Sequence, residues 1–117
     1  MSTDKYRRLV LAAKSKQFEF RLIYVVLASP ELNVERVRLR VKKGGHDVPE
    51  AKIRERWTRS IRQLPWFLNQ SDRAWIFDNS GAAPRQIGLK HEGKVILDPS
   101  APVVLREAIE QFQVSGP

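Results

Sequence analysis

The feature that most constrains this fold is an apolar run that leads directly into a helix start. Residues 18–28 first alternate between polar and apolar side chains, and they become wholly apolar from Leu22 to Ala28. Their β-branched and aromatic content is typical of a central strand in a parallel sheet that is covered on both faces. Ser29-Pro30-Glu31 follows at once and favours the cap and first turn of a helix.

The spacing of apolar residues, together with residues that start or end helices and turns, predicts the remaining elements. Apolar residues at helical spacing predict helices over residues 3–15, from Pro30 to the stop at Gly44-Gly45, from Pro49 onward, and over about 102–113. Residues 73–78 predict a strand, and residues 85–97 predict a hairpin. Two helices separate the first two strands, so these strands are expected to be parallel and adjacent or nearly so. The predicted fold is one α/β domain over residues 1–117, a small partly parallel sheet with flanking helices.

Composition narrows the chemistry. The chain has no cysteine and two histidines, which excludes disulfides and thiol catalysis and disfavours a metal site. Its longest apolar run is too short to cross a bilayer and no signal peptide is evident, so we expect a cytoplasmic protein with no membrane partner. A net charge of +8, from 21 Lys and Arg against 13 Asp and Glu, favours an anionic partner.

Two glycines imitate a phosphate-binding loop. Gly88 and Gly93-Lys94 have the G-x-x-x-x-G-K spacing, but Val95 follows where such a loop requires Ser or Thr. The residues around the glycines predict a hairpin, whereas the loop requires a strand before it and a helix after it. We therefore expect no nucleotide-binding loop here, and we assign no catalytic residue.

Arginines cluster along the second and third predicted helices, which meet at Gly44, Gly45 and His46. Guanidinium groups are always charged and offer paired donors to phosphate oxygens. The candidate phosphate-binding residues are Arg40, Arg54, Arg56 and Arg59. A solvated helix face with local ion pairs, such as Glu55 with Arg59, explains the same spacing equally well.

A second candidate site follows the strand at residues 73–78. Asp78 and Asn79 lie where α/β proteins usually bind ligands, although the same residues are common in turns. We expect Trp57 and Trp75 to lie on buried faces rather than to stack on bases. No nucleic-acid motif is present, so nucleic acid is a disfavoured partner.

One segment has a distinctive sequence, since Arg40 to Pro65 reads RVKKGGHDVPEAKIRERWTRSIRQLP. It resembles the lid segment of the zeta toxin-like P-loop kinases, also described as predicted ABC-type ATPases. LIYVVLASPEL before it and DRAWIFDNSG after it agree, so the similarity covers roughly residues 5–98. The resemblance implies a fold derived from an ATP-dependent phosphotransferase. In such kinases lid arginines close over the triphosphate, a role that falls by position to the four arginines named above, with Gly44, Gly45 and His46 as the lid loop.

The similarity covers only the C-terminal half of such a kinase. The family's phosphate loop and catalytic aspartate lie upstream of the matching segment, and neither has a counterpart in this chain. The resemblance therefore implies a protein that keeps the phosphate-binding lid and is inactive alone. It requires no cofactor by itself, and ATP with Mg²⁺ would bind only together with a complementary phosphate-loop half.

The expected partners are a nucleotide or other phosphate ligand, and either a second copy or a complementary protein. The alternative function is a regulatory or interaction module that binds a protein partner such as the missing kinase half. Because that half would supply neighbours for the strand at residues 18–28, we expect an apolar edge or face to be left open there.

Overall fold

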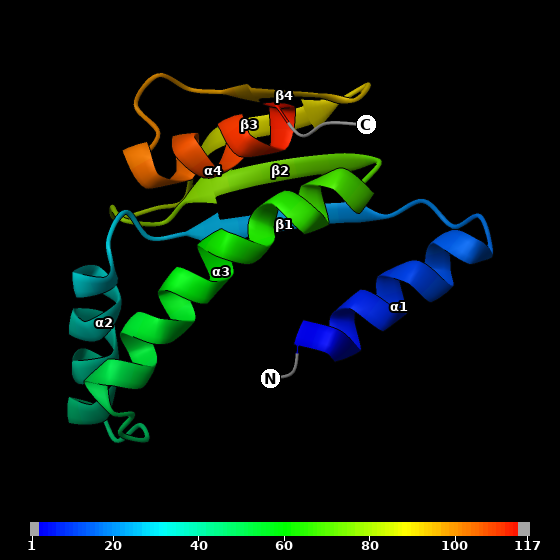
Figure 1. The fold of residues 1–117 in the computed structure, drawn as a ribbon. Coiled ribbons are helices and arrows are strands. Elements are labelled where there is room, and N and C mark those ends of the chain that lie inside the picture. Colours follow the sequence, from blue (N-terminus) through cyan, green and yellow to red (C-terminus); the bar gives the residue numbers. More distant parts are fainter. Residues whose placement is uncertain (1–2, 115–117) are drawn as a thin grey trace.

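The computed structural model describes the backbone of residues 3–114 and the side chains of residues 5–110. The elements follow the predicted order (Figure 1), and the α/β class is confirmed. In chain order they are α1 (Thr3–Ser15), β1 (Arg21–Val26), α2 (Pro30–Lys42), α3 (Glu50–Gln70), β2 (Arg73–Asp78), β3 (Arg85–His91), β4 (Lys94–Leu97) and α4 (Val103–Val114).

The four strands form one sheet in the order β1-β2-β3-β4. β1 and β2 are parallel neighbours joined by α2 and α3, as predicted, and the other two pairs are antiparallel. The prediction that β1 is a central strand covered on both faces is wrong. β3 pairs with the other side of β2, so β1 forms an edge of the sheet. Along β1 more buried and more exposed side chains alternate, and the extremes are Val26, which is 4% exposed, and Ile23, which is 68% exposed.

One face of the sheet packs against α3 and α4 (Figure 1). Leu64 and Leu68 of α3 and Leu105 of α4 bury their side chains there, because apolar residues recur every three or four positions along both helices. Ile76 at the centre of β2 is their fully buried counterpart in the sheet. α2 packs against α3 and lies beside the sheet rather than on it.

The predicted start and stop of α2 are both present. The Ser29 hydroxyl accepts a hydrogen bond from the Leu32 amide at 3.3 Å. At the other end the Gly45 amide donates to the Arg40 carbonyl at 2.8 Å, and the Gly44 amide donates to the Val41 carbonyl at 3.0 Å. Gly44 has φ +97°, the left-handed conformation in which glycine closes such helix ends.

The prediction that Gly88 and Gly93 belong to a hairpin rather than to a phosphate-binding loop is confirmed. β3 and β4 pair from Gly88 to His91, and the tight turn between them places Glu92 and Gly93 at positive φ. A bulge in β3 lies opposite Ile76 and Phe77. Both Ile87 and Gly88 are buried, and a Cβ on Gly88 would meet the Ile76 side chain at 3.0 Å, so this glycine serves packing.

α1 stands beside the free edge of β1 (Figure 1) and is attached to α3 at few points. The Arg7 guanidinium lies 4.9 Å from the centre of the Trp66 ring, and the Lys14 Nζ donates to the Gln70 carbonyl at 2.7 Å. Val10 is buried, whereas Leu9 of the same predicted apolar stripe is 56% exposed. Among the helices of residues 3–114, none is long and apolar enough to cross a membrane.

Candidate functional site

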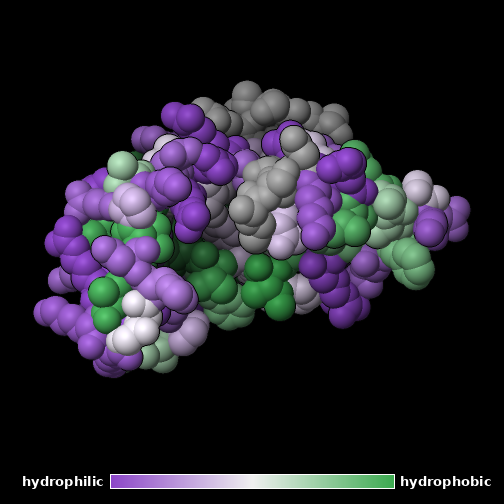
Figure 2. Space-filling view, turned by 90° about the horizontal axis from the view of Figure 1, so that it is seen from below, coloured by the Kyte–Doolittle hydropathy of each residue, from purple (hydrophilic) through white to green (hydrophobic). Residues whose placement is uncertain are grey.

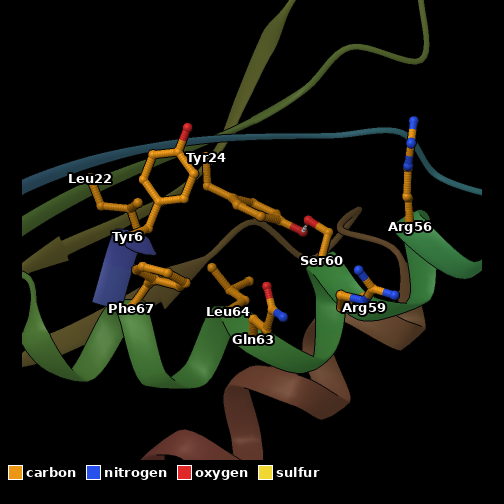
Figure 3. A pocket seen from close by; sticks show the side chains of 9 residues that line it. All are labelled: Tyr6, Leu22, Tyr24, Arg56, Arg59, Ser60, Gln63, Leu64 and Phe67. Atoms are coloured by element: carbon orange, nitrogen blue, oxygen red, sulfur yellow. Dashed lines mark hydrogen bonds between the residues drawn. The ribbon is translucent and has the colours of Figure 1, made fainter. Parts of the chain in front are cut away.

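A cavity of about 520 Å³ opens between the free edge of β1, one face of α3 and the start of α1. Figure 3 shows an apolar end and a polar end. The apolar end is formed by Tyr6, Leu22, Leu64 and Phe67, and the polar end by Tyr24, Arg56, Arg59, Ser60 and Gln63. In the view from below, apolar side chains gather in the middle of the molecule, beside a mostly hydrophilic part on the left and a part of mixed character on the right (Figure 2).

A pair of hydroxyl groups divides the two ends of the cavity. The Tyr24 phenol and the Ser60 hydroxyl lie 2.7 Å apart and share one hydrogen bond. Burial raises the pKa of the Tyr24 phenol above its usual 10.0, although the hydrogen bond to Ser60 opposes part of that shift. At neutral pH the phenol is therefore protonated and can donate, and the pair has one further donor for a ligand oxygen.

Two of the four predicted arginines lie at the polar end. Arg56 has no hydrogen bond or ion pair with another residue of the described part of the chain, and Figure 3 shows its side chain extended toward the end of β1. It also lines a smaller cavity of about 150 Å³ with Asn33 and Trp57. Arg59 forms the expected local ion pair with Glu55.

The other two arginines are not brought to this cavity. The Arg54 Nη1 lies 2.9 Å from a carboxylate oxygen of Glu31, and its Nε lies 3.6 Å from one of Glu50, so its guanidinium faces α2. The hydrogen bond from Arg54 is the main cause that lowers the pKa of the Glu31 carboxyl. Arg40 is exposed in the last turn of α2 and does not line the cavity.

The predicted lid loop closes a helix in this structure. Gly44 and Gly45 satisfy the last carbonyl groups of α2, and a Cβ on Gly45 would approach the Arg40 carbonyl oxygen to 2.9 Å. His46 is exposed, and it has no hydrogen-bond or ion-pair partner among the side chains that the structure describes, those of residues 5–110. Nothing in this geometry prepares His46 for proton transfer.

The loop after β2 uses its polar groups internally. The Asp78 carboxylate accepts hydrogen bonds from the Ser80 amide at 2.9 Å and from the Ser80 hydroxyl. The backbone amide of Asn79 donates to the Val26 carbonyl at 2.9 Å, and the Ser80 hydroxyl oxygen accepts from the backbone amide of Ala28 at 2.8 Å. Asp78 and Asn79 therefore tie together the carboxyl ends of β1 and β2, as turn residues do.

Tyr24, Ser60 and Gln63 were not among the predicted site residues. One signal was present for Ser60, because it occupies a position of the apolar face of α3 between Trp57 and Leu64. A hydroxyl on such a face requires a partner, and the tyrosine within the apolar strand is the donor or acceptor that meets it.

No group of three or more His, Cys, Asp or Glu side chains with metal-binding geometry occurs among the described residues. Comparison of the chain with protein-family models, with curated proteins and with solved structures finds no match.

Proposed function

We propose that the chain binds a phosphate-bearing small molecule in the cavity between β1 and α3. In this proposal it is the arginine-bearing portion of a zeta toxin-like phosphotransferase and has no catalysis of its own. The observation that carries the proposal is Arg56, a guanidinium that has no partner among the described side chains of residues 5–110 and that lines the cavity together with Arg59.

The two ends of the cavity suit the two parts of such a ligand. A phosphate group at the polar end would accept paired hydrogen bonds from the Arg56 guanidinium and a further one from the Tyr24–Ser60 pair. The apolar end, between Leu22 and Phe67, would take a base or another flat apolar group. The volume of about 520 Å³ is in the usual range for sites that bind small molecules.

Catalysis is assigned to a partner rather than to this chain. Phosphoryl transfer depends on a phosphate loop, a metal ion and a group that positions the nucleophile. Arginines alone supply only part of the charge stabilisation. ATP with Mg²⁺ therefore belongs to the proposal only together with a complementary half that carries the phosphate loop.

The test is a titration of the purified chain with ATP and with pyrophosphate, in which NMR chemical shifts report binding. We expect dissociation constants on the order of 1 mM, because exposed charged hydrogen bonds are offset by the ordering of mobile side chains. Arg56→Ala should weaken binding about tenfold. The matched control is Arg62→Ala, which removes the same charge from an exposed position of the same helix and should change affinity less than about twofold.

The positions of the shifts separate the proposal from diffuse attraction. ATP should shift the signals of Leu22 and Phe67, whereas pyrophosphate should shift only those at the polar end. Equal losses of affinity from the two arginine variants would mean that only the net charge of the chain attracts the anion, and the proposed site would be rejected.

A further inference from the structure

The register of the sheet lines up an apolar row on the face opposite α3 and α4. Ile23 pairs with Trp75, Trp75 with Leu89, and Leu89 with Ile96, so one row crosses all four strands. The ends of this row are 68% exposed at Ile23 and 67% exposed at Ile96. The expectation that Trp75 lies on a covered face is therefore wrong.

A second apolar pair extends this row. Val25 and Phe77 are register partners two residues further along β1 and β2, and Val25 is 54% exposed. Since alternate residues of a strand point to the same face, these side chains lie beside the apolar row. We refer to the surface formed by Ile23, Val25, Trp75, Phe77, Leu89 and Ile96 as the open face.

A basic row borders the open face on its other side. Arg21 pairs with Arg73, and His91 pairs with Lys94, each two residues from the apolar row and on the same face. Two members of the row have acidic neighbours, because the Arg21 guanidinium lies 3.1 Å from a Glu19 carboxylate oxygen and the His91 Nε2 lies 3.6 Å from one of Glu92. Arg73 and Lys94 have no ion pair with another described residue, so this border presents uncompensated positive charge.

These observations specify the chemistry of an occupant. Contiguous exposed apolar surface marks an interaction site in a soluble protein, and carboxylates are the complement of the basic row. A second copy would bring another net charge of +8 and another basic row, so it is electrostatically disfavoured. Most of the open-face side chains are aliphatic and cannot stack on bases, which disfavours single-stranded nucleic acid.

We propose that the open face binds an acidic amphipathic helix of a partner protein. The helix lies along the rows, across the strands, with its apolar stripe on the open face and its Glu and Asp flank beside Arg73 and Lys94. Four strands span about 14 Å, which corresponds to roughly ten helical residues. This surface and the cavity lie on opposite faces of the sheet, because Leu22 and Tyr24 alternate with Ile23 and Val25 along β1. The proposal is therefore independent of the ligand proposed above.

The probe is a fluorescein-labelled synthetic helix of about 18 residues, with leucines at i, i+3, i+4 and i+7 and glutamates on one flank. Its binding to the full chain is followed by fluorescence anisotropy. We expect a dissociation constant below about 100 µM, and at least about tenfold weaker binding of the same peptide with lysine in place of glutamate.

Two variants locate the contact. Ile96→Glu should weaken binding of the glutamate peptide at least about tenfold, because it places a carboxylate in the apolar row. Val103→Glu is the matched control, since Val103 is 66% exposed on α4, away from the open face, and it should change affinity less than about twofold. Arg73→Glu should reverse the preference so that the lysine peptide binds more tightly. Circular dichroism verifies that each variant is folded.

Four outcomes would overturn the proposal. The first is no binding of the glutamate peptide at about 500 µM, and the second is an equal loss from the Ile96 and Val103 variants. The third is tighter binding of an oligothymidylate that Arg73→Glu abolishes, which would assign the face to nucleic acid. The last is a dimer in sedimentation that Ile96→Glu dissociates, which would assign it to a second copy.

Discussion

Among single residues, Lys90 illustrates how a charge is accommodated inside this small domain. It is 6% exposed on β3, and its Nζ donates to the Leu68 carbonyl and, at 2.6 Å, to the Ser71 carbonyl. These groups lie at the C-terminal end of α3, where carbonyls lack partners within the helix and the helix dipole is negative. The side chain of a strand thus completes the end of a helix.

Lys90→Met should lower the free energy of unfolding by about 2 kcal/mol, because the Ser71 carbonyl oxygen loses the Lys90 donor, whereas the Leu68 carbonyl oxygen keeps the Ser71 hydroxyl as a donor. Chemical denaturation at pH 7 measures this loss. Lys94→Met is the control on the neighbouring strand, and since Lys94 is exposed it should change stability by less than about 0.5 kcal/mol. A similar loss from both variants would contradict the role of Lys90 at the helix end.

The difference in stability between the native protein and Lys90→Met should also depend on pH. Burial and then the nearby Lys14 lower the pKa of the Lys90 ammonium from its usual 10.5, while Asp72 opposes part of the shift. In the range between the lowered pKa and 10.5 the unfolded chain binds more protons than the folded one, so stability rises with pH. The advantage of the native protein over Lys90→Met should therefore increase as the pH approaches 10.5.

Among the elements, α2 shows a helix whose end depends on one conformation. Gly44 at φ +97° directs the chain out of α2 and toward α3. Gly44→Ala should lower the free energy of unfolding by about 1 kcal/mol, the cost of the left-handed conformation for a residue with a Cβ. Gly81→Ala is the control, because a Cβ meets no atom within 4 Å at either glycine and, of the two, only Gly44 has a positive φ. Thermal or chemical denaturation compares the two variants. Equal effects would mean that the strain at Gly44 is absent.

Elements were predictable where the signal is local. Ser29 and Pro30 before α2, the glycines after it, and the turn at Gly93 each act within a few residues. The apolar run alone did not predict the edge position of β1, because the sequence of an apolar residue such as Ile23 is the same whether or not a helix covers it. The resemblance did lead us to expect an open apolar edge or face at this strand, and β1 is an edge strand with Ile23 exposed. The partner of Arg54 was equally hidden, because Glu31 lies 23 positions earlier and faces it only after α2 has packed on α3.

The molecule as a whole is less compact than its length requires. Its Cα radius of gyration is 15.3 Å, with extents of 44 × 33 × 23 Å, whereas a compact domain of 117 residues has a radius of gyration of about 13 Å. α1 and the lower parts of α2 and α3 project from the body and account for the difference (Figure 1). Small-angle scattering at low protein concentration should therefore give a radius of gyration of at least about 15 Å. A value near 13 Å would mean that α1 folds back onto the body.

The parallel pairing of β1 with β2 has a consequence for synthesis. Register partners in these strands are 52 residues apart, as Arg21 and Arg73 are. At about 5 to 20 residues per second, the ribosome completes β2 about 3 to 10 seconds after β1. During this interval residues 21–26 have no strand to pair with, while the helices of the crossover are still being made. Chaperones that hold extended apolar segments have these seconds in which to bind the nascent chain.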